Sequence, residues 1–133
     1  MSGPGLVNLY LAVCEIAGNS MDRIPYAEDI TQRAVVGTCQ NAMEAVAVFC
    51  RLLGTVASNL ALTLNARGGV YLAGGILPRI LPYFRESDFR KRFEEKGRFK
   101  ATLEAIPTFV VVHPTPAFVG LAHLISKRSI TPP

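Results

Sequence analysis

Two adjacent glycines, Gly74 and Gly75, form the best candidate binding site in this sequence. They follow a short apolar run at residues 69–73 and precede Ile76 and Leu77, where a helix is predicted to begin. Because neither glycine has a Cβ, a flat or charged ligand can lie directly on the backbone. The positive end of the following helix would favour a phosphate, and open α/β sheets bind ligands at the carboxyl ends of parallel strands. No G-K-[ST] follows and no G-x-G-x-x-G is present, so a tight turn without a ligand explains the pair equally well.

Residues suited to acid–base chemistry are present, but their spacing indicates no catalytic set. The acidic pairs at residues 28–29 and 94–95 lie on segments predicted to be exposed, so a solvated surface explains them. His113 follows a predicted strand and precedes a proline, which fits a loop with a structural role. His123 lies in an apolar stretch and is predicted to be a core or interface residue. We therefore assign no catalytic residue to this chain.

The three cysteines, Cys14, Cys39 and Cys50, cannot all pair within one chain, and none belongs to a C-x-x-C motif. Buried free thiols of an intracellular protein explain them most simply. Both histidines lie far along the chain from any cysteine pair, so a structural zinc site lacks its ligands. No metal site is predicted.

The first half of the chain is predicted to be helical. One helix covers residues 5–17 and is closed by Gly18 and Asn19, and a loop surrounds Pro25. Asp29 is predicted to cap a short second helix that ends at residue 37. The strongest pattern follows, with apolar residues three and four positions apart for six turns: Met43, Val46, Cys50, Leu53, Ala57, Leu60 and Leu64.

The flanks of this long helix are apolar as well. A coiled coil needs charged flanking positions, whereas these are Ala45, Phe49, Leu52, Val56 and Ala61. A helix that is apolar nearly all round is predicted to be buried between other elements.

The second half of the chain is predicted to contain two strands. Residues 69–73 and 108–112 are short apolar runs without alternation, which favours strands covered on both faces and paired in parallel. Between them, Ser87 is predicted to cap a helix that Gly97 stops. A last helix is predicted from Thr115 and Pro116 to the two basic residues at 127–128.

Length and composition indicate one folded domain. The chain has 133 residues, of which 50% are hydrophobic and 18% charged, and this balance excludes disorder as a global description. The net charge of +4 is mild, and residues 85–100 mix seven basic with four acidic side chains, so an amphipathic helix explains them better than a nucleic-acid surface. The start lacks the features of a signal peptide, and the most apolar run, residues 52–66, is short for a bilayer span. The sequence predicts a soluble, cytoplasmic protein that binds neither membranes nor nucleic acid.

Four ordered motifs carry a family resemblance. They are S-G-P-G-L-V-N-L-Y at residues 2–10, V-Y-L-A-G-G-I-L-P-R at 70–79, F-E-E-K-G-R-F at 93–99, and Ile106-Pro107 with His113 and Pro116. Together they closely resemble the C-terminal part of bacterial glucokinases, in the hexokinase and actin-like ATPase superfamily. The resemblance spans residues 2–124.

The resemblance implies an α/β fold, the C-terminal portion of an actin-like ATPase (ribonuclease H-like) domain that is helix-rich with a short, mostly parallel sheet. Residues 1–128 would form the C-terminal, nucleotide-side portion of a glucokinase large domain, and residues 129–133 a tail or linker. In the family, the strand–Gly-Gly–helix element resembles the adenosine motif. Gly74 and Gly75 would thus let the nucleotide approach the backbone, with Ile76 and Leu77 beside it.

The enzyme implied by the resemblance transfers the γ-phosphoryl group of ATP, held with Mg²⁺, to the 6-hydroxyl of glucose. This chain would supply the adenosine-binding side and not the catalytic base. Its expected partners are glucose, ATP, the N-terminal half of the same kinase and a second copy in a homodimer.

Several family motifs are absent from this chain. The Asp-Gly-Gly-Thr phosphate motif, the Asn-Asp pair that holds the base, and the Glu and His residues that hold the sugar are not found. Met1 is therefore expected to be a start within a longer protein, and the isolated chain is predicted to be inactive. The alternative is a non-enzymatic binding or regulatory module of the same fold, joined through residues 129–133 to another domain such as a DNA-binding one. The scattered cysteines do not match the clustered zinc-binding cysteines of the family's repressor branch.

Overall fold

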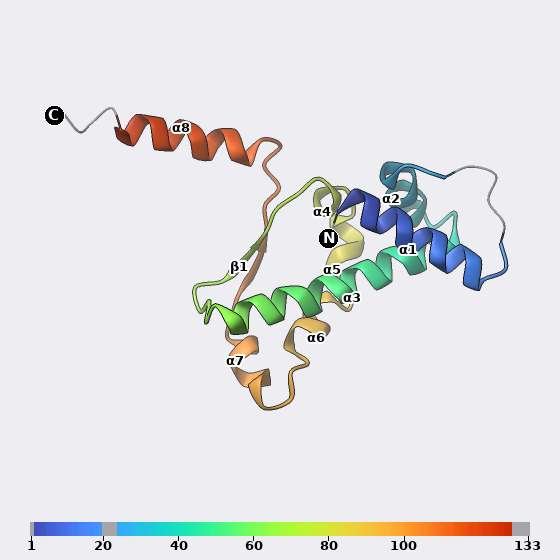
Figure 1. The fold of residues 1–133 in the computed structure, drawn as a ribbon, viewed down its shortest axis with the longest axis horizontal. Helices are drawn as coiled ribbons and strands as arrows, with labels where there is room; N and C mark the ends of the chain where they lie inside the picture. The colour runs from blue at the N-terminus through green and yellow to red at the C-terminus, as the bar shows by residue number, and fades with distance from the viewer. Residues whose placement is uncertain (1, 20–23, 129–133) are drawn as a thin grey trace.

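A computed structural model describes residues 2–19 and 24–128. Eight α-helices, one 3₁₀ helix and two strands make up these residues (Figure 1). In chain order they are α1 (Gly3–Ile16), α2 (Ala27–Val36), α3 (Gln40–Thr63), β1 (Val70–Leu72), α4 (Ile76–Arg79), α5 (Leu81–Arg85), α6 (Phe89–Glu94), η1 (Gly97–Phe99), α7 (Lys100–Glu104), β2 (Thr108–Val110) and α8 (Pro116–Arg128). The predicted tail at residues 129–133 lies outside the described residues.

The first two helices begin and end at residues whose chemistry explains the boundary. Ser2 caps α1, because its Oγ accepts a hydrogen bond from the Gly5 N–H at 3.3 Å. The predicted cap of α2 at Asp29 is wrong: the helix begins at Ala27, and the Asp29 carboxylate instead accepts a hydrogen bond from the Tyr26 N–H at 3.2 Å. The predicted end of α2 is confirmed by the residue that follows it, Gly37, whose φ of 75° is left-handed.

Helix α3 is the central element of the molecule. It lies against α1, α2 and α6, and its inward face, which includes Ala45, Phe49 and Cys50, is buried. The prediction that it is covered on all sides is wrong for the described residues, because a stripe formed by Leu52, Val56 and Leu60 remains exposed.

This central helix is also longer than its most apolar run suggested. With 24 residues and a mean hydropathy of 1.7 over its most apolar stretch, it is long and apolar enough to cross a membrane by length and composition. However, 44% of that stretch is buried inside the molecule, and core helices of folded proteins meet the same two criteria. We therefore describe α3 as the core helix.

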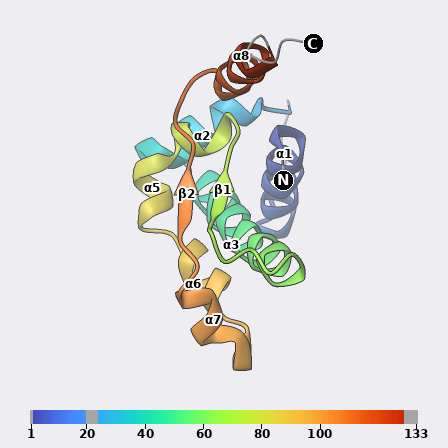
Figure 2. The ribbon, with the colours of Figure 1, turned by 90° about the vertical axis from the view of Figure 1, so that its left-hand side faces the viewer.

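The two strands pair in parallel, as predicted, with Val70 opposite Thr108 and Leu72 opposite Val110. Figure 2 shows them running side by side. One face of this small sheet is covered, and Leu72 is buried there. On the other face the rings of Tyr71 and Phe109 stack at 4.9 Å and stay 66% and 44% exposed. The prediction that both faces of the sheet are covered is therefore wrong for the part of the chain that the structure describes.

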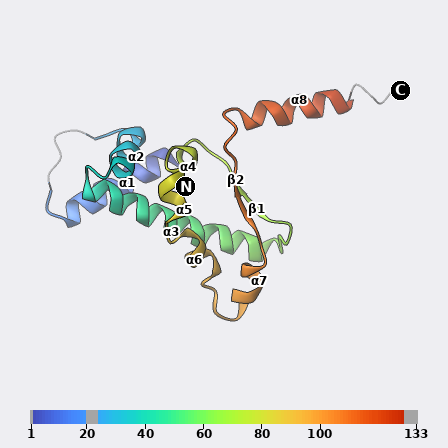
Figure 3. The ribbon, with the colours of Figure 1, turned by 180° about the vertical axis from the view of Figure 1, so that it is seen from behind.

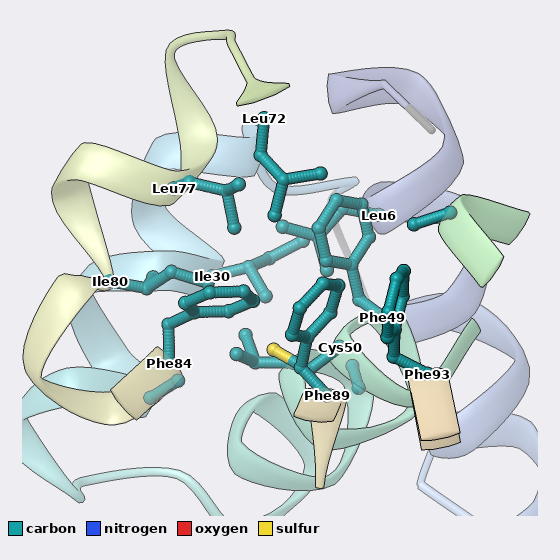
Figure 4. Close-up of a cluster of buried hydrophobic side chains, with 14 of the residues drawn as sticks. Leu6, Ile30, Phe49, Cys50, Leu72, Leu77, Ile80, Phe84, Phe89 and Phe93 are labelled. Carbon is teal, nitrogen blue, oxygen red and sulfur yellow. The ribbon is translucent and has the colours of Figure 1, made fainter. Parts of the chain in front are cut away.

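A single core joins the helices to the covered face of the sheet. Figure 4 shows Leu6 of α1, Ile30 of α2 and Phe49 of α3 meeting Leu72 and the aromatic rings that the later helices contribute. Those rings are Phe84, Phe89 and Phe93. The start of α1 and the end of β1 are thus fixed relative to one another through common side chains.

The amphipathic helix predicted between Ser87 and Gly97 is shorter than expected. Helix α6 ends at Glu94, and α7 follows as a further element that no sequence pattern indicated. The guanidinium group of Arg90 donates to the carbonyl oxygens of Leu103, Glu104 and Ile106 at 3.2, 3.0 and 2.9 Å, and so holds the end of α7 against α6.

Helix α8 extends away from the rest of the molecule, as the views from the front and from behind agree (Figures 1 and 3). Its predicted start at Pro116 is confirmed. All its side chains described, residues 116–126, are exposed, although Phe118, Val119, Leu121, Leu124 and Ile125 are apolar.

Candidate functional site

The Gly-Gly turn lies where it was predicted, between the end of β1 and the start of α4. Gly74 has a φ of 140°, which L side chains rarely adopt, so the turn itself requires a glycine there. Gly75 is different, because its φ of −77° and ψ of −14° suit any residue. A Cβ built on either glycine meets no atom of the described residues within 4 Å. The backbone therefore faces open space at both positions.

This open space belongs to a cavity of about 340 Å³. Its lining comes from three parts of the fold: the start of α1, the middle of α3 and the whole turn from β1 into α4. These residues are Ser2, Gly3, Phe49, Leu53, Tyr71, Leu72, Ala73, Gly74, Gly75, Ile76 and Leu77. All four residues predicted to bind a nucleotide thus line one cavity.

The lining residues described are uncharged. Phe49, Leu53 and Leu77 give the cavity an apolar floor, whereas the glycines leave its rim as bare backbone. Leu77 is buried and also belongs to the core, and Ile76 is half-buried. A flat, neutral ring system suits such a cavity better than a phosphate group, which would find no cation among these residues.

Helix α4 has only four residues, so few aligned peptide dipoles support the predicted preference for a phosphate, which stays a prediction. The longer helix at this cavity is α1, with 14 residues, whose first residues Ser2 and Gly3 are part of the lining. The S-G-P-G start is part of a motif in the sequence, but no pattern indicated that it lies beside the glycines some 70 residues later. The shared cavity is the new observation.

Other candidate residues lie elsewhere. The Nδ1 atom of His113 accepts a hydrogen bond from the Thr115 N–H at 3.1 Å, which is consistent with the predicted structural role in the loop before α8. His123 is exposed on α8, so it does not lie in the core of the described residues, and its alternative place at an interface stays a prediction.

Of the two acidic pairs predicted to be solvated, Glu28, Asp29 and Glu95 are exposed, whereas Glu94 is half-buried. Three of these carboxylates pair with arginines: Glu28 with Arg79, Glu94 with Arg90, and Glu95 with Arg92. No three His, Cys, Asp or Glu side chains within residues 2–19 and 24–128 lie together as metal ligands.

A larger groove of about 730 Å³ lies on another side of the start of α1. It is lined by Gly3, Pro4, Val7 and Asn8 and by residues 24–28. It includes part of the motif at residues 2–10 but not the glycine turn, and we assign it no ligand.

Comparison with known proteins shows what the chain is similar to. A family profile described as Glucokinase matches residues 1–128. The chain belongs to the glucokinase family. It is 53% identical to a glucokinase of Paramagnetospirillum magneticum over 126 residues and 51% identical to one of Nitrobacter hamburgensis over 124 residues. These matches cover 95% and 93% of this chain.

A solved structure of a family member supports the assignment. The crystal structure of a glucokinase from an Antarctic psychrotroph matches 95% of this chain with a TM-score of 0.83 and 32% sequence identity. The predicted fold class, a helix-rich C-terminal portion of the glucokinase fold with a short parallel sheet, is confirmed.

The chain spans much less than a whole family member. It covers 39% of the Paramagnetospirillum protein, 38% of the Nitrobacter protein and 39% of the psychrotroph chain. Most of the length of these relatives therefore has no counterpart in this chain.

Proposed function

We propose that this chain is the adenosine-binding part of an ATP-dependent glucokinase. The whole enzyme would transfer the γ-phosphoryl group of ATP to the 6-hydroxyl of glucose. The observation that carries this proposal is the neutral cavity in which the open Gly74–Gly75 backbone meets the start of α1, in a chain that belongs to the glucokinase family.

The cavity supports adenosine rather than the phosphates as the part of ATP bound here. The adenine ring would lie against the bare backbone of Gly74 and Gly75, over the apolar side chains of Phe49, Leu53 and Leu77. The triphosphate carries several negative charges, and the described lining residues offer none of opposite sign. The phosphates would therefore extend toward groups that the rest of the kinase supplies.

Among the residues that the structure describes, we assign neither a catalytic base nor a metal ligand. Phosphoryl transfer needs a base aligned with the sugar hydroxyl and cations beside the phosphates, within one closed cleft. His113 is engaged within its loop, and no metal-ligand cluster occurs in the part of the chain that the structure describes. These residues do not fit a dedicated Mg²⁺ site, so we assign this chain no part in holding the ion.

A chimera tests the proposal in a complete enzyme. The part of the Paramagnetospirillum glucokinase that this chain does not cover is joined to this chain, and glucose phosphorylation is measured in a coupled assay. We expect ATP-dependent activity within about tenfold of the parent enzyme, because the two sequences share 53% identity over the exchanged part.

Gly75→Val in the chimera tests the adenosine site. The side chain would enter the cavity without backbone strain, since the φ at Gly75 is ordinary and the space is open. We expect the KM for ATP to rise at least tenfold, equivalent to about 1.4 kcal/mol, with the KM for glucose changed less than twofold. Gly74→Val is unsuitable because its φ of 140° would strain the turn in any case.

Gly68→Val is the matched control, since a Cβ there also meets no described atom within 4 Å and Gly68 does not line the cavity. It should leave both KM values unchanged. An unaltered KM for ATP in Gly75→Val would remove the adenosine assignment. A folded chimera without any phosphorylation would favour the alternative, a non-enzymatic module of the same fold.

A further inference from the structure

A cluster of thiols outside the nucleotide cavity joins α1 to the start of α3. The Cys39 Sγ lies 3.7 Å from the Tyr10 hydroxyl, and the Asn41 side-chain amide donates to the Cys14 Sγ at 3.4 Å. The same Tyr10 hydroxyl also interacts with Cys14. Two thiols from different helices therefore share one phenol, whereas the third, Cys50, lies in the core.

Cys39 has the surroundings of a nucleophilic thiol. It is the N-cap residue of α3, a helix of 24 residues, and it is half-buried rather than enclosed. Its sulfur lies 3.7 Å from the Tyr10 hydroxyl, its N-cap position places it beside the first backbone N–H groups of α3, and Arg33 of α2 adds a positive charge. Burial would raise the pKa of the Cys39 thiol, but these groups outweigh it and lower the pKa below its ordinary value.

Cys50 provides the contrast within the same chain. It is fully buried in the core, and this burial raises the pKa of its thiol to about 11. Because the thiolate is the reactive form, Cys50 should be inert under conditions in which Cys39 reacts.

We propose that Cys39 and Cys14 form a peroxide-sensitive thiol pair, with Cys39 as the attacking thiol and Cys14 as the resolving one. In the first step the Cys39 thiolate attacks hydrogen peroxide. Its S–O bond forms as the O–O bond breaks, and hydroxide leaves and takes up a proton to become water. The peroxide is reduced by two electrons and Cys39 is oxidised to a sulfenic acid.

In the second step Cys14 attacks the sulfenic sulfur. The S–S bond forms, the S–O bond breaks, and the departing hydroxyl leaves as water with the proton from the Cys14 thiol. A disulfide requires the two Cβ atoms to lie about 3.8 Å apart, so the proposed step includes any movement that brings Cys14 and Cys39 to this distance. That movement falls at two helix ends, because Cys14 lies in the last turn of α1 and Cys39 precedes the first turn of α3.

Peroxide treatment of the folded 133-residue chain tests the pair without any kinase assay. After a brief exposure to hydrogen peroxide at pH 7, remaining thiols are blocked and the digested chain is analysed by mass spectrometry. We expect a linked peptide pair containing Cys14 and Cys39, which dithiothreitol separates again. Cys50→Ser, which removes the core thiol, should give the same linked pair.

Single variants separate the two roles. Cys14→Ser should leave a lasting sulfenic acid on Cys39 that dimedone captures, whereas Cys39→Ser should leave Cys14 unoxidised. Where the serine variant loses its native circular dichroism, Cys14→Ala replaces it. In the unmodified chain, iodoacetamide should alkylate Cys39 at least tenfold faster than Cys50 at pH 7, and urea should abolish the difference.

Three results would overturn the proposal. They are oxidation of Cys50 before Cys39, equal peroxide reactivity of Cys14 in the presence and absence of Cys39, and a lasting sulfenic acid in the unmodified chain. The last result would show that Cys14 does not resolve the intermediate.

Discussion

Gly54 is the residue at which a single added methyl group should disturb the fold most sharply. It lies in the middle of α3, where α6 crosses, and a Cβ built there falls 2.5 Å from the Phe89 carbonyl oxygen and 3.2 Å from the Phe93 nitrogen. Real Cβ atoms essentially never approach another atom within 3.0 Å, so the backbones of α3 and α6 must separate by about half an ångström. The neighbouring atoms belong to the backbone and cannot rotate away.

The expected effect of Gly54→Ala follows from two opposing terms. Overpacking a core costs typically 1–3 kcal/mol, and a clash with backbone lies at the upper end. Replacing glycine by alanine inside a helix returns about 1 kcal/mol. The net loss should be about 2 kcal/mol in the free energy of unfolding, or roughly 6–10 °C in Tm for a chain of this size.

Urea unfolding followed by circular dichroism measures this loss, with Gly120→Ala as the matched control. Gly120 is also a helical glycine, but a Cβ there meets no described atom within 4 Å, so the substitution should be neutral or slightly stabilising. If Gly54→Ala were as stable as the unmodified chain, the close approach of α3 and α6 would be refuted.

Two further predictions concern the packing of α7 and the chain as a whole. Arg90→Ala should lower the free energy of unfolding by roughly 2 kcal/mol, because three carbonyl oxygens lose a charged donor, and Arg90→Lys should not restore the loss. Arg92→Ala is the control, because it breaks only an exposed pair with Glu95. It should cost less than about 0.5 kcal/mol in the same urea experiment. The isolated 133-residue chain should show no glucose phosphorylation in a coupled assay and ATP binding no tighter than about millimolar. Turnover by the purified chain alone would contradict the proposed division of roles.

Sequence patterns predicted the elements whose signals are local. The end of α2 before Gly37, the start of α8 at Pro116 and the parallel pairing of β1 with β2 are confirmed. Each depends on a residue with special backbone chemistry or on a short apolar run without alternation, and these act within a few positions of the chain. The cap of α2 was misplaced by three residues because Asp29 fits the first turn of a helix as well as its cap.

The candidate site was predicted in part. The Gly74–Gly75 turn has a local signal, and it lies in a cavity as expected. The contribution of Ser2 and Gly3 had no such signal, because it depends on how α1 packs on α3 and how α3 packs beneath β1. That arrangement follows from the shared core around Leu6, which no local spacing encodes.

The wrong predictions about burial have a common physical cause. The sequence predicted that α3 is covered on all sides, the strands on both faces, and His123 by a core or an interface. The described residues instead leave a stripe of α3, one face of the strands and His123 exposed. An apolar pattern indicates that a surface is buried in the folded protein, but not which segment covers it.

The exposed surfaces are extensive. They are the stripe on α3, the Tyr71–Phe109 pair and the described side chains of α8. On the proposed function, these are the surfaces that contact the rest of the kinase, which accounts for most of the length of the relatives. The same division would explain why the cavity at Gly74 and Gly75 is uncharged, because the groups that neutralise the phosphates would come from the segments that cover these apolar surfaces.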